Sequence, residues 1–109
     1  MAEWDPVFEH EKAGDGRPVL MVSGEVDLAV AARFASELAT LLASANGEAL
    51  VNLSHVGFMD SSGVRELLIA NRTAEDAGSQ LVLVAPSESC RHVLQVSGAW
   101  GEFRVEEAS

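Results

Sequence analysis

Hydrophobic and polar side chains alternate over residues 7–12, a pattern that is typical of an edge strand. Residues 13–18 follow with two glycines, Gly14 and Gly16, which supply the positive φ angles that a tight reversal needs. We therefore expect the apolar residues 19–23 to return antiparallel to the first strand. The start of the chain is predicted to be a β-hairpin.

Three later segments, at residues 28–45, 63–77 and 87–97, carry apolar residues at the period of an amphipathic helix. The positions expected to face the core are Ala31, Phe34, Leu38, Leu41, Leu42 and Ala45 in the first helix, Val64, Leu67, Leu68, Asn71 and Ala74 in the second, and Cys90, Val93 and Leu94 in the third. Asp27 stands directly before the first helix, and we expect its carboxylate to accept from the free backbone N–H groups there. A glycine ends each helix, at Gly47, Gly78 and Gly98.

Short apolar runs separate the helices. Residues 50–53 and 81–84 are predicted to be strands buried on both faces of a sheet, although Asn52 is a polar member of the first. Residues 54–62 are predicted to form a loop, and residues 103–105 a last strand.

This order of elements predicts a single α/β domain. After the hairpin, the alternation of strands and helices implies parallel pairing through right-handed crossovers, so we expect a small mixed β-sheet packed with about three to four helices. The chain has 109 residues, which suffices for one compact domain and is too short for two ordinary ones. We assign residues 1–109 to one domain with a core from about residue 7 to residue 105.

The chain is strongly acidic, with 17 Asp and Glu residues, 7 Lys and Arg residues and a net charge of −10. This balance argues against direct binding to nucleic acid or to an anionic membrane, because both need a basic face, and it favours a protein partner with such a face. Cys90 is the only cysteine, which excludes an intrachain disulfide and argues against a thiolate zinc site. Neither a signal-peptide pattern nor an apolar run of spanning length is present in the sequence, so we expect a cytoplasmic protein.

The segment that carries candidate chemistry is Phe-Met-Asp-Ser-Ser-Gly at residues 58–63, before the second long helix. Its small polar residues place hydroxyls and backbone N–H groups at the positive end of that helix, and we expect Gly63 to keep the approach to those amides open. A phosphate on a serine here would gain from the helix N-terminus. It would also stand beside Asp60 and, where the sheet brings the two strand-helix loops to one edge, near Glu25 and Asp27. Such a cluster would repel a partner that recognises the unmodified acidic surface.

Three blocks in this order and spacing resemble the STAS domain of bacterial anti-sigma-factor antagonists. They are Gly-Glu-Val-Asp at residues 24–27, the stretch from Leu53-Ser54 to the Phe-Met-Asp-Ser-Ser-Gly segment, and the stretch from Leu-Val-Leu-Val at residues 81–84 to Pro86-Ser87. The resemblance spans nearly the whole chain.

The resemblance implies that Ser61, the serine directly after the aspartate, is phosphorylated by an anti-sigma factor that is itself a serine kinase. Ser62 is the alternative acceptor. The unphosphorylated antagonist would bind the anti-sigma factor and release the sigma factor, phosphorylation would break the pairing, and a phosphatase would restore it. Asp27, Asp60 and Gly63, together with Ser62, match family positions around that surface.

Two residues of the second helix extend the candidate surface. Arg65 stands where many family members have a small residue, and it can pair with a phosphate or with a carboxylate on the kinase. Ile69 falls on the outer, polar face of the helix, which makes it a candidate anchor for a partner. Glu25 completes the set of candidate contacts, although an exposed polar residue without a partner is the alternative for it.

An enzymatic function is not expected. His55, Asp60 and Ser61 lie too close in sequence to converge as a hydrolytic triad, and the chain has neither a nucleophile elbow nor a Gly-rich phosphate loop followed by Lys. The histidines are far apart, so we expect no metal and no cofactor. The alternative function is a non-switching STAS scaffold subunit of a transporter or sensory complex, in which Ser61 only caps its helix.

Overall fold

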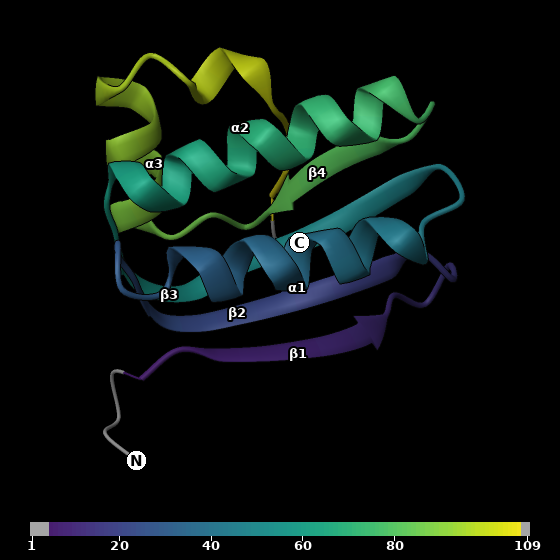
Figure 1. The fold of residues 1–109 in the computed structure, drawn as a ribbon, viewed down its shortest axis with the longest axis horizontal. Helices are drawn as coiled ribbons and strands as arrows, with labels where there is room; N and C mark the ends of the chain where they lie inside the picture. The colour runs from purple at the N-terminus through teal and green to yellow at the C-terminus, as the bar shows by residue number, and fades with distance from the viewer. Residues whose placement is uncertain (1–4, 108–109) are drawn as a thin grey trace.

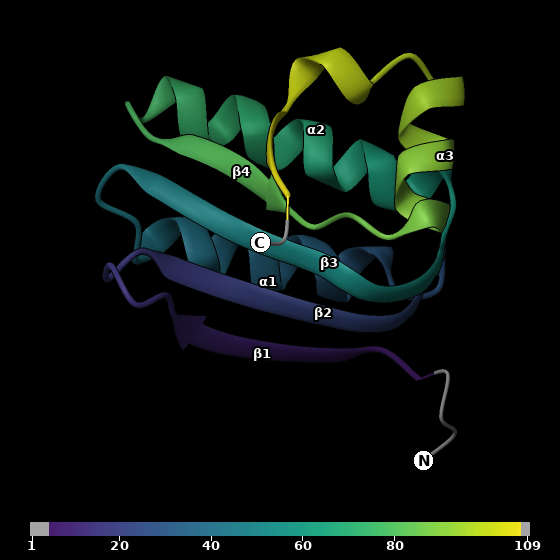
Figure 2. The ribbon, with the colours of Figure 1, turned by 180° about the vertical axis from the view of Figure 1, so that it is seen from behind.

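The computed structural model describes residues 5–107 and shows one five-stranded sheet in the order β1-β2-β3-β4-β5 (Figures 1 and 2). The strands are β1 (Val7–Lys12), β2 (Pro18–Val26), β3 (Glu48–Met59), β4 (Gln80–Val84) and β5 (Arg104–Glu106). The helices are α1 (Ala31–Ala43), α2 (Ser61–Asp76) and α3 (Glu88–Val96), with a short 3₁₀ helix at Trp100–Glu102. β1 is antiparallel to β2 and every other pair is parallel, which confirms the predicted hairpin and the mixed α/β sheet.

The helices α1 and α2 lie side by side across one face of the sheet, and α3 packs at the end where the parallel strands finish (Figure 1). Seen from behind, the other face of the sheet carries neither α1 nor α2 (Figure 2). This arrangement follows from right-handed crossovers, since each helix between two adjacent parallel strands is placed on the same side of the sheet.

The hydrophobic core lies between the sheet and the two long helices. The strand residues in this core alternate along each strand, as the pleat requires. They are Leu20 and Val22 of β2, Ala49, Val51 and Leu53 of β3, and Leu81 and Leu83 of β4. Their neighbours Leu50 and Val82 are also buried but stand outside this core, so they cover the opposite face of the sheet. The predicted burial of the two central strands on both faces is therefore confirmed.

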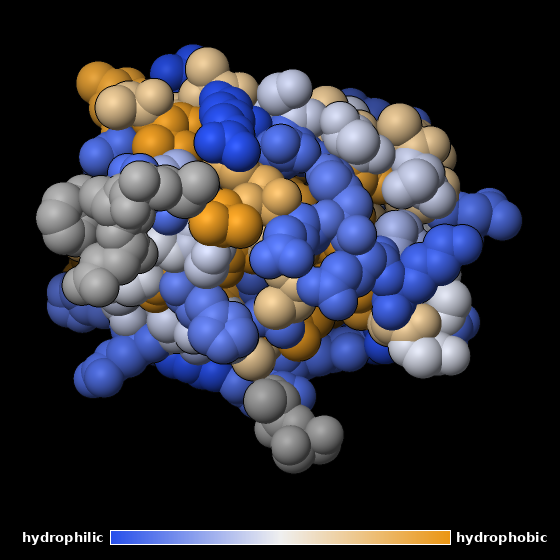
Figure 3. Space-filling model, turned by 90° about the horizontal axis from the view of Figure 1, so that it is seen from below, coloured by the Kyte–Doolittle hydropathy of each residue, from blue (hydrophilic) through white to orange (hydrophobic). Residues whose placement is uncertain are grey.

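The strand β1 forms one edge of the sheet. Phe8 packs against the core, with its ring stacked on Phe34 at 5.9 Å between centroids, whereas Glu9, Glu11 and Lys12 are exposed. Viewed from the side of β1, the surface is mainly hydrophilic, with small apolar patches between the charged side chains (Figure 3). Charged side chains on an edge strand oppose pairing with another sheet.

The prediction of a loop at residues 54–62 is wrong, because β3 continues without a break to Met59. β2 also runs on to Val26, and the pairing of Val26 with Met59 supplies the hydrogen bonds that a local pattern cannot reveal. β4 pairs with β3 only as far as Asn52, so the second half of β3 extends past its neighbour. The polar and glycine residues in this half of β3 reflect exposure to solvent rather than a loop. Of residues 54–59, four are exposed: Ser54, His55, Gly57 and Phe58.

The first helix begins at Ala31 rather than residue 28, and Asp27 does not cap it. Residues 28–30 form a turn in which backbone carbonyls satisfy the early N–H groups: Val30 donates to Asp27 at 3.0 Å and Ala31 donates to Leu28 at 3.3 Å. Val30 is the N-cap residue and makes no side-chain cap bond. The turn places Leu28 outward with 77% of its surface exposed.

Arg17 joins the hairpin turn to the strands β3 and β5. Its guanidinium Nη1 donates to Glu48 at 2.7 Å and to Glu106 at 2.8 Å, and its Nε donates to Asp15 at 2.8 Å. Arg104 bonds the other carboxylate oxygen of Glu48 at 2.7 Å. Hydrogen bonding from Arg17 lowers the pKa of the Glu106 carboxyl below its ordinary value.

Candidate functional site

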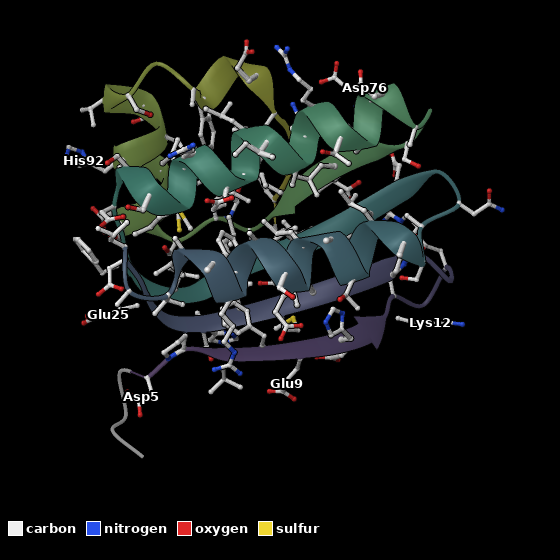
Figure 4. All side chains as sticks on the ribbon, in the orientation of Figure 1. Asp5, Glu9, Lys12, Glu25, Asp76 and His92 are labelled. Carbon is white, nitrogen blue, oxygen red and sulfur yellow. The ribbon has the colours of Figure 1, made fainter. Side chains whose placement is uncertain are left out.

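The carboxyl ends of β2 and β3 bring two acidic loops to one edge of the sheet. Val26 and Met59 are neighbours in the parallel register, and the N–H of Asp60 donates to the carbonyl oxygen of Val26 at 3.2 Å. Asp27 and Asp60 therefore follow adjacent strand ends. Glu25, which pairs in register with Phe58, projects outward at this same end of the molecule (Figure 4). The structure thus brings together the carboxylates that the sequence separates by more than thirty residues.

Asp60 is the residue that caps α2. Its backbone is extended, and its Oδ1 accepts from the N–H of Ser62 at 2.8 Å. Its carbonyl oxygen also accepts from the N–H groups of Gly63 and Val64, at 3.1 and 3.3 Å. Because the aspartate satisfies the N-terminal amide of Ser62, the capping role that we weighed for the serine hydroxyls belongs to Asp60.

Ser61 is the first residue of α2, and its side chain is exposed. Within residues 5–107, no group hydrogen-bonds the Ser61 hydroxyl. Ser62 is half-buried, and its backbone N–H is bonded to Asp60. The Ser62 hydroxyl likewise has no hydrogen-bond partner within residues 5–107, so exposure is what distinguishes the two candidate acceptors: Ser61 is exposed and Ser62 is half-buried.

Gly63 has a different structural role from the one expected. It is buried, and a Cβ built there would lie 2.7 Å from Cγ of Met59 and 3.1 Å from Cγ1 of Val26. The first turn of α2 thus rests directly on the ends of β2 and β3, and only glycine permits that approach without displacement of Met59. We expected Gly63 to leave the helix amides open to a partner, whereas the structure gives it a packing role.

Asp27 is half-buried beside α1, and its Oδ1 is fully buried without a hydrogen-bond partner within residues 5–107. A buried polar oxygen that lacks a partner costs free energy, so this side chain contributes little to folding. Asp27 does lie at the shared strand edge, but it does not cap α1 as predicted.

The two α2 residues of the candidate surface follow Ser61 by one and by two helical turns. Arg65 is exposed one turn after Ser61, and no carboxylate of residues 5–107 lies within ion-pair distance of it. Ile69 has 48% of its surface exposed, but it lies about 12 Å from Ser61 along the helix axis, since each residue rises about 1.5 Å. Arg65 thus lies one turn from Ser61 and one turn from Ile69 on the exposed side of α2.

Two exposed apolar residues at the same strand edge were missed by the sequence reasoning. Leu28 follows Asp27 and is 77% exposed, and Phe58 stands two residues before Asp60 and is 46% exposed. The helical pattern assigned to residues 28–45 and the loop assigned to residues 54–62 concealed both. The sequence signal that could have identified them is an apolar residue within two positions of each aspartate, Asp27 and Asp60.

A family model described as "Mlab, STAS domain" matches residues 10–103. The chain belongs to the STAS domain family. The crystal structure of an anti-sigma factor antagonist from Mycobacterium paratuberculosis shares the fold at 23% identity, with a TM-score of 0.84, covering 96% of this chain and 88% of that one.

The anti-sigma factor antagonist SpoIIAA is similar to this STAS domain at 28% identity. Its unphosphorylated form gives a TM-score of 0.75 and covers 94% of this chain and 89% of that chain. The phosphorylated form of SpoIIAA, described as a cell fate determinant of Bacillus, gives a TM-score of 0.70 and covers 94% of this chain and 92% of that chain. The fold of this STAS domain therefore matches that of anti-sigma-factor antagonists.

A groove of the STAS domain lies between the protruding half of β3 and the start of α3. It is lined by Val56, Gly57, Ser87, Glu88, Ser89, Arg91, His92 and Gln95. Arg91 is already engaged, because it donates to the carbonyl of Pro86, pairs with Glu107 and lies over the ring of Trp100 at 5.4 Å. Beneath the groove, burial raises the pKa of the Cys90 thiol. Arg91 thus links α3 to Trp100 and to Glu107, so its guanidinium is already committed within the domain.

Further features bear on the kind of site this is. Within the part of the chain that the structure describes, no three acidic, histidine or cysteine side chains stand close enough to hold a metal ion. Among residues 5–107, no helix has the length and apolar character needed to cross a membrane.

Proposed function

We propose that this STAS domain is an anti-sigma-factor antagonist that is switched by phosphorylation at Ser61. The unphosphorylated form binds an anti-sigma factor with serine kinase activity and thereby releases the sigma factor. Phosphorylation abolishes this binding, and a phosphatase that acts on the phosphoserine restores it. The similarity to SpoIIAA, an anti-sigma factor antagonist whose structure is known in unphosphorylated and phosphorylated forms, supports this proposal.

The observation that carries the proposal is that Asp60, and not Ser61, caps α2. Asp60 caps α2 through its bond to the Ser62 N–H, which leaves the exposed Ser61 hydroxyl free of any structural bond among residues 5–107. A kinase can therefore reach the oxygen without unfolding the helix end. The γ-phosphoryl group of ATP would pass to the Ser61 Oγ, the hydroxyl proton would be lost, and ADP would leave.

The physical basis of the switch is charge. A phosphate adds roughly −1.5 to −2 charges at neutral pH, to an edge that already carries Glu25, Asp27 and Asp60. The helix N-terminus stabilises the phosphate, so the modified domain stays folded. The bulk of the phosphate obstructs the close approach of the partner to this edge, and its charge repels any partner carboxylate that faces Arg65 in the unmodified complex.

The partner surface is expected to combine basic side chains with an apolar pocket. The basic groups of the partner pair with Glu25 and Asp60. Its apolar pocket accepts Leu28 and Phe58, which are exposed beside these carboxylates. Buried apolar anchors within a polar rim are typical of protein interfaces.

The test is a phosphorylation reaction with a serine-kinase anti-sigma factor of the source cell and ATP, followed by mapping of the phosphate by mass spectrometry. We expect modification of the wild type and of Ser62→Ala, and none of Ser61→Ala. Modification that persists in Ser61→Ala and disappears in Ser62→Ala would move the switch to the second serine. Absence of modification in every form would contradict the proposal and favour a constitutive scaffold.

A further inference from the structure

The exposed cation next to Ser61 on α2 is Arg65. The two residues are four positions apart, so their side chains share one face of the helix with Cβ atoms about 6 Å apart. The anionic position precedes the cationic one, which is the favourable order for such a pair. Both residues are exposed, so the guanidinium can rotate toward the serine without displacing a core side chain.

Arg65 is also available, in contrast to most arginines of the chain. Arg17 and Arg104 are held by carboxylates of the ion-pair network, Arg91 pairs with Glu107, and Arg33 lies over the ring of Phe8 at 5.0 Å. The guanidinium of Arg65 has no ion-pair partner among residues 5–107. A phosphate on Ser61 would therefore meet an uncommitted five-donor group rather than compete with an existing carboxylate.

We infer that Arg65 is the internal partner of the Ser61 phosphate, so that phosphorylation both adds a dianion and withdraws an exposed cation from the partner-binding edge. This inference rests on the proposed modification of Ser61. In the unmodified domain the Arg65 guanidinium faces solvent and can reach a carboxylate on the partner. In the modified domain the planar guanidinium holds two phosphate oxygens, since this geometry matches a phosphate well.

Arg72 provides a matched control on the same helix. It is exposed, has no ion-pair partner among residues 5–107 and lies eleven positions after Ser61, which returns it to nearly the same helical face. Its Cα stands about 16 Å further along the axis, beyond the distance over which exposed charges interact at physiological salt. Removal of either arginine changes the net charge equally, but only Arg65 can contact the phosphate.

The experiment uses the full chain with phosphoserine incorporated at position 61 by genetic encoding, which requires no kinase. The second ionisation of the phosphate is followed by ³¹P NMR in the otherwise wild-type domain, Arg65→Gln and Arg72→Gln. Asp60, Asp27 and Glu25 also face this phosphate from the strand ends, but they are common to all three proteins. Glutamine is a good helix former at an exposed position, so the fold is preserved, as circular dichroism will check.

A contact with Arg65 favours the dianion and lowers its second pKa. We expect the midpoint of Arg65→Gln to lie above that of the parent by about 0.5 pH unit or more, and that of Arg72→Gln to stay within about 0.2 unit. The difference should shrink at about 1 M salt, where screening is strong. Equal midpoints for the parent and Arg65→Gln, or equal shifts in both variants, would overturn the inference. Neither result bears on whether a kinase modifies Ser61, which the mapping experiment decides separately.

Discussion

The backbone N–H of Asp60 donates to the carbonyl oxygen of Val26, and this bond of 3.2 Å fastens the ends of β2 and β3 together. It holds the start of α2 against the turn that leads to α1. The exposed Ser61 hydroxyl is thereby fixed at an edge where two acidic loops meet. The site depends on long-range pairing of two strands rather than on the Asp-Ser-Ser-Gly segment alone.

The two aspartates at this edge should differ in their effect on stability. Asp60→Ala removes the bond to the Ser62 N–H and should lower the free energy of unfolding by about 1 kcal/mol, as is typical for an N-cap residue. Asp27→Ala should cost less than about 0.5 kcal/mol, because its buried Oδ1 has no partner to lose within residues 5–107. Urea denaturation of both variants measures the difference. Equal losses would show that Asp27 supports α1 after all.

Gly63 should tolerate no side chain. A Cβ at this position meets Met59 at 2.7 Å, so Gly63→Val should destabilise the domain by about 1 to 3 kcal/mol through overpacking. Gly57→Val is the control, since a Cβ there has nothing within 4 Å and valine suits a strand. A Gly63→Val domain as stable as its Gly57→Val counterpart, in thermal unfolding, would show that α2 can move away from the strand ends.

The burial of β4 predicts a large effect at Leu83. Leu83 is fully buried in the core, so Leu83→Ala should cost about 2 to 5 kcal/mol of the free energy of unfolding. Leu28→Ala removes the same side chain from a position that is 77% exposed, and it should change stability by less than about 0.5 kcal/mol. Denaturant titration of the pair compares the two sites directly. A small loss at Leu83 would contradict the sheet assignment.

Acid should weaken the domain partly through the Arg17 network. Hydrogen bonds from Arg17 lower the folded-state pKa of Glu106, and they also lower that of Asp15, so both carboxylates favour the folded state when ionised. This contribution is present above the unfolded pKa values, about 4 for such carboxyls, and is lost as the pH falls through the folded values. Arg17→Gln should therefore lose less stability between neutral pH and pH of about 3 than the wild type does. Denaturant midpoints across that range provide the measurement, and parallel pH profiles would refute the role of the network.

Much of the fold could be predicted from periodicity. The helical spacing of Phe34, Leu38 and Leu41, and the apolar run from residue 81 to residue 84, locate elements whose buried faces are recorded in the sequence itself. The extension of β3 to Met59 could not be predicted in this way. Its exposed residues follow no strand pattern, and its hydrogen bonds depend on β2, which is distant in sequence.

In the candidate site, too, local features could be predicted from the sequence and features that depend on tertiary contacts could not. The local residue types place Ser61 just before a helix expected to begin at Gly63, whereas α2 begins at Ser61 itself, beside the capping Asp60. The roles of Asp27 and Gly63 could not be inferred locally. Asp27 stands before a backbone turn rather than before the helix itself, and the need for Gly63 arises from Met59 and Val26 across a tertiary contact.

The central claim is that a phosphate on Ser61 turns binding off. Its most direct test is the affinity of the serine-kinase anti-sigma factor for this domain with serine or with genetically encoded phosphoserine at position 61, measured by calorimetry without ATP. We expect the phosphorylated form to bind at least about 100-fold more weakly, because the bulky, hydrated phosphate stands on the exposed Ser61 at the proposed interface and obstructs close contact there. Equal affinities of the two forms would contradict the account.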